Sequence, residues 1–69
     1  MKERIIILYR FVLNLEKDLD VSNPNTIEYF KYLRRQYRLH FIFMSKSARE
    51  KFQKRLNNIS KIIYENIKN

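Results

Sequence analysis

The sequence lacks the residue types on which several common kinds of site depend. Cys is absent and His occurs once, which excludes disulfides and metal sites built from thiolates or a His cluster. Gly is absent and Pro occurs once, so Gly-turned β-hairpins and Gly-rich phosphate loops are disfavoured. The longest apolar run, residues 5–9, is too short to span a bilayer. We therefore expect a helical protein without a transmembrane segment, a secretory signal or an evident cleavable presequence.

Acidic side chains are also scarce in the middle of the chain. None occurs between Glu28 and Glu50, and the net charge of +8 is concentrated there. Residues 1–30 carry a net charge of −1, residues 31–55 carry +8 and residues 56–69 carry +1. Such a block attracts anionic partners in a salt-dependent way, and these include nucleic acid, anionic membranes and acidic proteins.

Apolar spacing predicts three helices, over residues 2–19, 25–40 and 47–67. In each segment, apolar side chains recur at intervals of three and four residues, which places them on one side of a helix. These apolar stripes consist of Ile5, Leu8, Val12, Leu15 and Leu19, then Phe30, Leu33, Tyr37 and Phe41, and finally Phe52, Leu56, Ile59, Ile63 and Ile67. The pattern predicts an all-α, three-helix antiparallel bundle that forms a single domain over residues 1–69.

Polar residues mark the predicted helix starts. The second helix has two equally fair starts, a capping box of Asn25 with Glu28, or an Asn23 cap with Pro24 at the first helical position. The third helix is expected to start at Ser47, with Glu50 completing a capping box. The apolar segment FIFMSK between these two helices is expected to be a loop.

Arg10 is the one charge within the apolar stretch IIILYRFVLNL. On a helix it points away from the core stripe and shares its side with Ile6 and Leu13. One interpretation is that the stem of Arg10 lies over Ile6 while its head reaches water. The interpretation that we favour is a docking face, in which exposed apolar side chains surround a fixed cation.

Four cations of the second helix, Lys31, Arg34, Arg35 and Arg38, recur at i, i+3, i+4 and i+7 and so share one face. A solvated helix face would usually include Glu to relieve their repulsion. Arg side chains fit phosphate and carboxylate groups, so an anion-binding face is favoured over a merely solvated one. Cations of the third helix are expected to extend it, namely Arg49, Lys51, Lys54 and Arg55.

No catalytic arrangement is recognised in the sequence, and an enzyme is not expected. His40 stands without a nucleophile or paired carboxylates beside it, and Asp20 is expected in a turn. Tyr29, Tyr32 and Tyr37 alternate with cations, as in stacking platforms for single-stranded nucleic acid, although core packing is the commoner role at this spacing.

The triplet Leu8-Tyr9-Arg10 resembles the motif of the LYR-motif family, also called the complex I LYR family, of small helical adaptors. Its position in the first helix is typical of that family. The stretch YLRRQYR is similar to the family's downstream basic segment, with Tyr37 where Phe is usual and Arg38 matching. A Lys-Arg pair in the third helix completes the resemblance, which covers residues 4–67.

The resemblance implies an adaptor in the mitochondrial matrix that binds an acidic acyl carrier protein. The partner's acyl-phosphopantetheine would insert among the helices, and no cofactor would be bound directly by this chain. The implied partner-binding residues are Tyr9, Arg10, Lys31, Arg34, Arg35, Tyr37, Arg38 and Arg55. The apolar residues expected to line the acyl chain are Leu8, Val12, Leu33, Phe52, Leu56 and Ile59.

Several functions remain open from the sequence. The leading hypothesis is an assembly factor that stabilises a client complex of the respiratory chain, of iron-sulfur cluster biogenesis or of the mitoribosome. The turn NPNTIEYF is similar to that of the accessory subunit of the mitochondrial cysteine desulfurase, which is a second possibility. A small basic helical nucleic-acid-binding protein is an alternative from another class, and a peripheral protein on anionic membrane is a weaker one.

Overall fold

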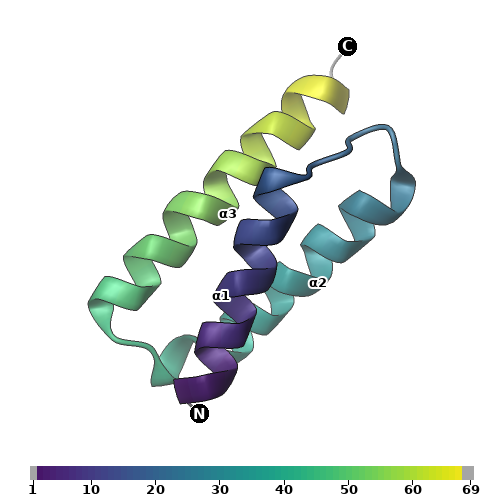
Figure 1. The fold of residues 1–69 in the computed structure, drawn as a ribbon. Helices are drawn as coiled ribbons and strands as arrows, with labels where there is room; N and C mark the ends of the chain where they lie inside the picture. Colours follow the sequence, from purple (N-terminus) through teal and green to yellow (C-terminus); the bar gives the residue numbers. More distant parts are fainter. Residues whose placement is uncertain (1, 68–69) are drawn as a thin grey trace.

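The computed structural model describes residues 2–67 and confirms the predicted all-α, three-helix bundle (Figure 1). The elements are α1 (Lys2–Lys17), α2 (Pro24–His40), a 3₁₀ turn η1 (Phe41–Phe43) and α3 (Lys46–Ile67). Successive helices run in opposite directions in a rod of about 37 × 19 × 18 Å. The predicted single domain also included residues 1, 68 and 69, which lie outside the described residues.

The core follows the predicted stripes closely. Its buried side chains are Leu8, Val12, Leu15, Phe30, Leu33, Tyr37, Met44, Phe52, Leu56, Ile59 and Ile63. The prediction for Ile67 is wrong, because this side chain is 65% exposed. At 22 residues, α3 is longer than α1 and α2, so its last turn extends past the helices that could cover it (Figure 1).

Phe52 of α3 lies at the centre of an aromatic cluster that joins all three helices. Its ring centroid is 5.1 Å from that of Tyr9 in an edge-to-face contact and 5.4 Å from that of Tyr37 in a stacked one. Tyr37 in turn contacts Phe41 edge-to-face at 5.7 Å. Such pairs add about 0.5–1.5 kcal/mol each beyond the burial of their area. The cluster therefore fixes the rotation of each helix, and with it the side chains that face outward.

Short-range polar contacts determine where α1 ends and where α2 begins. The Asn23 Oδ1 accepts a hydrogen bond from the Asn25 N–H at 2.9 Å, and Pro24 occupies the first helical position. Of the two predicted starts, the Asn23–Pro24 cap is therefore confirmed. The first helix ends at Lys17, before the predicted Leu19, because the chain turns around Asp20, whose carboxylate accepts hydrogen bonds from the Ser22 N–H and Oγ–H.

The predicted capping box at Ser47 is wrong, since Ser45 caps α3. The Ser45 Oγ accepts a hydrogen bond from the Ala48 N–H at 3.2 Å, and the Ser45 carbonyl accepts one from the Arg49 N–H at 3.0 Å. Ser47 lies inside the first turn. The helix thus begins at Lys46, one residue before the predicted start, and its cap lies two residues before the predicted one.

We predict that Ser45→Ala lowers the free energy of unfolding by about 1 kcal/mol, because an orphan N–H of the first turn loses its acceptor. The matched change Ser47→Ala should alter it by less than about 0.5 kcal/mol, since this hydroxyl caps nothing. Urea unfolding followed by circular dichroism measures both. A larger loss in the Ser47 variant than in the Ser45 variant would contradict the assignment of the cap.

Candidate functional site

The four predicted cations of α2 form one exposed surface, which we call the α2 cation cluster: Lys31, Arg34, Arg35 and Arg38. All four side chains are exposed and together line a shallow hollow of about 280 Å³. No acidic side chain among residues 2–67 forms an ion pair with any of them. The helical spacing that predicted a shared face is thus confirmed, and the positive charge of the cluster is not neutralised within the described chain.

The cluster continues toward α3 through amide side chains. Arg34 and Arg38 line a second hollow, of about 140 Å³, with Gln53 and Asn57 of α3. Tyr37 contributes to the wall of this hollow but is itself buried in the core. A partner at this surface would therefore contact guanidinium groups beside amide groups. The buried Tyr37 ring mainly supports α2 from the core side.

Arg49, which was expected to extend the cluster from α3, is held by η1. Its Nε–H donates a hydrogen bond to the Phe41 carbonyl at 3.0 Å, and its Cζ lies 3.9 Å from the centre of the Phe41 ring. This combination of a hydrogen bond and a cation–π contact ties the start of α3 to η1. The Arg49 guanidinium thus stabilises the junction between η1 and α3.

Arg55 makes an ion pair across the bundle with α1. Its Nη1 lies 2.9 Å from the Glu16 Oε1. The Tyr9 hydroxyl and the Glu16 carboxylate both raise the pKa of Arg55 above its usual value. Tyr9 is half-buried against Phe52. Two of the predicted partner-binding residues, Tyr9 and Arg55, are thus engaged in the contact between α1 and α3.

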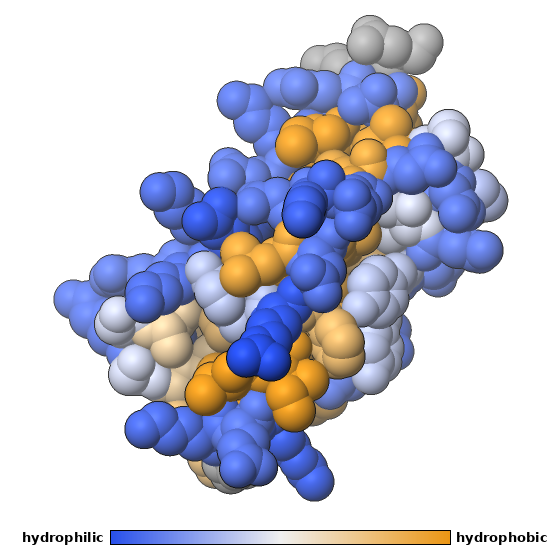
Figure 2. All heavy atoms as spheres, viewed as in Figure 1, coloured by the Kyte–Doolittle hydropathy of each residue, from blue (hydrophilic) through white to orange (hydrophobic). Residues whose placement is uncertain are grey.

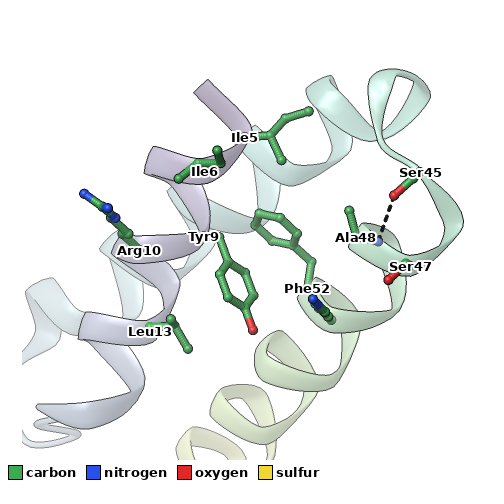
Figure 3. A pocket seen from close by; sticks show the side chains of 10 residues that line it. Ile5, Ile6, Tyr9, Arg10, Leu13, Ser45, Ser47, Ala48 and Phe52 are labelled. Carbon is green, nitrogen blue, oxygen red and sulfur yellow. Dashed lines mark hydrogen bonds between the residues drawn. The ribbon is translucent and has the colours of Figure 1, made fainter. Parts of the chain in front are cut away.

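Arg10 lies at the rim of a hollow between α1 and α3. The hollow has a volume of about 440 Å³, and Ile6 and Leu13 of α1 line it opposite Lys51 of α3. Figure 3 shows Arg10 extended away from Tyr9 and Phe52, so its charge is at the edge and not inside. It has no hydrogen bond or ion pair within residues 2–67.

The outer side of α1 is apolar, as the sequence predicted for the side that carries Arg10. Ile6, Ile7 and Phe11 are exposed there. Figure 2 shows apolar side chains gathered over this face with hydrophilic ones between them. The first helix therefore has one apolar side in the core and another at the surface, where a cation accompanies it.

The six residues expected to line an acyl chain are all buried side chains of the closed core: Leu8, Val12, Leu33, Phe52, Leu56 and Ile59. Phe52 is only 1% exposed. The hollow beside Arg10 reaches this set only at Phe52. An acyl chain among these six side chains would require the helices to separate.

The predicted partner-binding residues therefore belong to different places in the fold. The α2 cation cluster lies on α2 and faces Gln53 and Asn57 of α3. Arg10 lies beside the hollow between α1 and the start of α3, and the two surfaces share no lining residue. The bundle is stabilised from inside by Tyr37, and along the contact between α1 and α3 by Tyr9 and Arg55.

Two further titratable groups, His40 and Asp20, have partners within the chain. The His40 Nδ1 lies 2.8 Å from the Gln36 carbonyl oxygen, which satisfies one of its ring nitrogens. Hydrogen bonds from Ser22 lower the pKa of Asp20, as expected for a carboxylate in a turn. Within residues 2–67, no group of three His, Asp or Glu side chains could hold a metal ion. No helix there is long and apolar enough to cross a membrane.

No protein-family model matches the chain, and neither a curated protein nor a solved structure matches it. Function therefore has to be inferred from the geometry of the chain's own side chains, together with the resemblance of its motifs.

We predict that Arg49→Met lowers the free energy of unfolding by about 1–2 kcal/mol, because the Phe41 carbonyl loses one of its two hydrogen-bond donors and the Phe41 ring loses its cation. The matched variant Lys51→Met removes an exposed cation of the same helix and should change stability by less than about 0.5 kcal/mol. Denaturant unfolding of both proteins distinguishes the two roles. Equal stabilities would show that Arg49 is an ordinary surface cation.

Proposed function

We propose that this chain is a non-catalytic adaptor that binds an acidic acyl carrier protein and so stabilises or helps assemble a larger client complex. The observation that carries the proposal is the α2 cation cluster, in which four exposed cations line one hollow and have no acidic partner in residues 2–67. Four like charges within two helical turns repel each other. An anionic partner relieves this repulsion, which makes the cluster a favourable place for one to bind.

The chemistry of the cluster fits carboxylates and phosphate. Arg34, Arg35 and Arg38 can each present two N–H donors to one carboxylate or phosphate group. A helix of acidic side chains would lie along the cluster, and the phosphate of a phosphopantetheine arm would fit between guanidinium groups. Long-range attraction would raise the association rate, and added salt would lower it.

The acyl group of such a partner would supply a second, apolar contribution. Each methylene that leaves water contributes about 0.8 kcal/mol. The predicted lining residues are packed together in the free chain, so entry of an acyl chain would widen the bundle between its helices. Occupancy would stabilise the widened state by mass action, since the acyl group binds the folded chain and not the unfolded one.

Family and compartment belong to the same proposal. The motif at residues 8–10, the basic stretch of α2 and the Lys-Arg pair of α3 resemble the LYR-motif family, and they support a place in the mitochondrial matrix. The stretch RLH at the end of α2 and the segment KIIYENIKN resemble LYR motif-containing protein 9. The segment NPNTIEYF at the start of α2 resembles the accessory subunit of the mitochondrial cysteine desulfurase, which supports iron-sulfur cluster biogenesis as one client process.

We predict that reversing two charges of the cluster, Arg34→Glu with Arg38→Glu, weakens binding to a purified acyl-loaded carrier protein at least about 100-fold. Two favourable charge contacts become repulsive, and each typically costs more than 1 kcal/mol when part-desolvated. Isothermal titration calorimetry at two salt concentrations measures the affinity. The wild-type affinity should fall as salt rises.

The matched control is Lys17→Glu with Lys61→Glu, which makes the same charge change at two exposed positions, one on α1 and one on α3. Neither residue lines the hollow of the cluster, so affinity should stay within about threefold of wild type once the change in net charge is screened. An unchanged affinity of the α2 variant, or an equal loss of affinity in both variants, would contradict the proposal.

A specific observation also favours nucleic acid as a second candidate partner. Tyr29 and Tyr32 are exposed and stacked, with ring centroids 6.4 Å apart and 15° between their planes. Lys31 lies between them in sequence and belongs to the cluster. Aromatic rings beside cations are the elements with which proteins hold single-stranded nucleic acid.

Gel-shift titration with single-stranded RNA decides this second candidate. Under it, Tyr29→Ala with Tyr32→Ala lowers affinity about tenfold or more, because two stacking contacts are lost. The control Tyr64→Ala removes an exposed ring of α3 and leaves affinity unchanged. If the affinity for RNA is the same without both tyrosines, RNA binding is non-specific attraction by charge and this candidate is wrong.

A further inference from the structure

The last turn of α2 and η1 together expose three large apolar side chains at one end of the bundle. Ile42 is 73% exposed, more than any other large apolar side chain of residues 2–67. Leu39 is 61% exposed and Phe43 52%. We call these three residues the apolar tip. They lie at the end of the bundle where α1 begins (Figure 1).

The apolar tip is held in place by its neighbours in sequence. Phe41 packs against Tyr37 and lies under the Arg49 guanidinium, while Met44 is buried and its N–H donates a hydrogen bond to the Phe41 carbonyl at 3.1 Å. With Phe41 and Met44 fixed inward, Ile42 and Phe43 have to project outward. Their exposure is therefore built into the fold and costs no rearrangement when a partner binds.

Cations surround the apolar tip. Lys46 follows it at the start of α3 and is exposed, and Lys2 lines a hollow of about 490 Å³ together with Phe43. Arg4 lines another hollow beside His40. The acidic residues of this end are Glu3 and Glu50, whereas the last turn of α2 and the first turn of α3 contain none. The surroundings of the tip are therefore net positive.

We propose that the apolar tip inserts into the interfacial region of an anionic lipid membrane and that the nearby cations hold its headgroups. Two features favour lipid over a protein partner. The side chains project from a turn, as a wedge between lipids does, and the surrounding charge matches an anionic leaflet. With no helix of residues 2–67 able to cross a bilayer, the contact would be peripheral. This proposal stands independently of the carrier-protein proposal, because it depends on different residues.

The absence of Trp from the sequence allows a direct test. Phe43→Trp places a single fluorophore at the tip, and the full chain carrying it is mixed with vesicles of phosphatidylcholine with phosphatidylglycerol, or of phosphatidylcholine alone. We expect a blue shift of emission and strong quenching by brominated lipids with the anionic vesicles only. Ile67→Trp, at the opposite end of α3, is the matched control and should show neither effect.

A binding measurement complements the spectroscopy. Ile42→Ser with Phe43→Ser should lower the partition coefficient onto anionic vesicles about tenfold or more, because two apolar side chains no longer enter the interface. Ile62→Ser with Ile67→Ser removes two exposed apolar side chains of α3 and should leave partition unchanged. Circular dichroism of each variant establishes that the helices are retained.

Three results would overturn the proposal. An unchanged emission of the Phe43→Trp variant on anionic vesicles would show that the tip stays in water. Equal partition of the tip variant and the wild type would assign adsorption to charge alone, such as that of the α2 cation cluster. A blue shift that depends on protein concentration without vesicles would show that the tip binds a second copy of the chain or another protein surface.

Discussion

The packing of Phe52 against Tyr9 and Tyr37 is the contact on which the rest of the molecule depends. It joins α1, α2 and α3 at one point of the core. Because this contact fixes the rotation of α2, it also decides that the α2 cation cluster faces outward. Packing and charge are thus linked, since the cations occupy the face of α2 beside the one that buries Phe30, Leu33 and Tyr37.

The excess positive charge is used in two different ways. On α3, Arg49 and Arg55 make contacts within the chain, Arg49 with Phe41 and Arg55 with Glu16. On α2, Arg34 lies over the Phe30 ring, with its Cζ 5.8 Å from the ring centre, but no member of the cluster forms an ion pair within residues 2–67. The charge of the cluster therefore stays available to a partner. The outer side of α1, with Arg10 among exposed apolar side chains, and the apolar tip are further surfaces that the bundle leaves uncovered. A small helical protein with several uncovered surfaces is suited to holding other molecules together.

Local patterns were predictable from the sequence, whereas contacts between distant residues were not. The stripes and the shared face of the α2 cations follow from helical periodicity alone, and Asn23–Pro24 is a local cap. Ser45 and Ser47 have equal capping propensity, and the choice between them depends on Met44 and Phe41 packing inward. The contacts of Arg55 and Tyr9 could not be predicted from local patterns, because they depend on Glu16, which lies 39 residues from Arg55 in the sequence. Exposure of Ile67 and the tip depended on the unequal lengths of the helices and the geometry of η1.

The central claim is that the α2 cation cluster has no acidic partner within residues 2–67. The thermal unfolding midpoint of the isolated protein between about 20 mM and about 500 mM NaCl tests it most directly, because salt screens the repulsion among these cations. The account predicts that the midpoint rises by roughly 4 °C and that most of this rise disappears in the Lys31→Gln, Arg35→Gln variant. A midpoint that falls with salt, or a rise that the variant retains in full, would show that the charges of the cluster are already balanced in the folded chain.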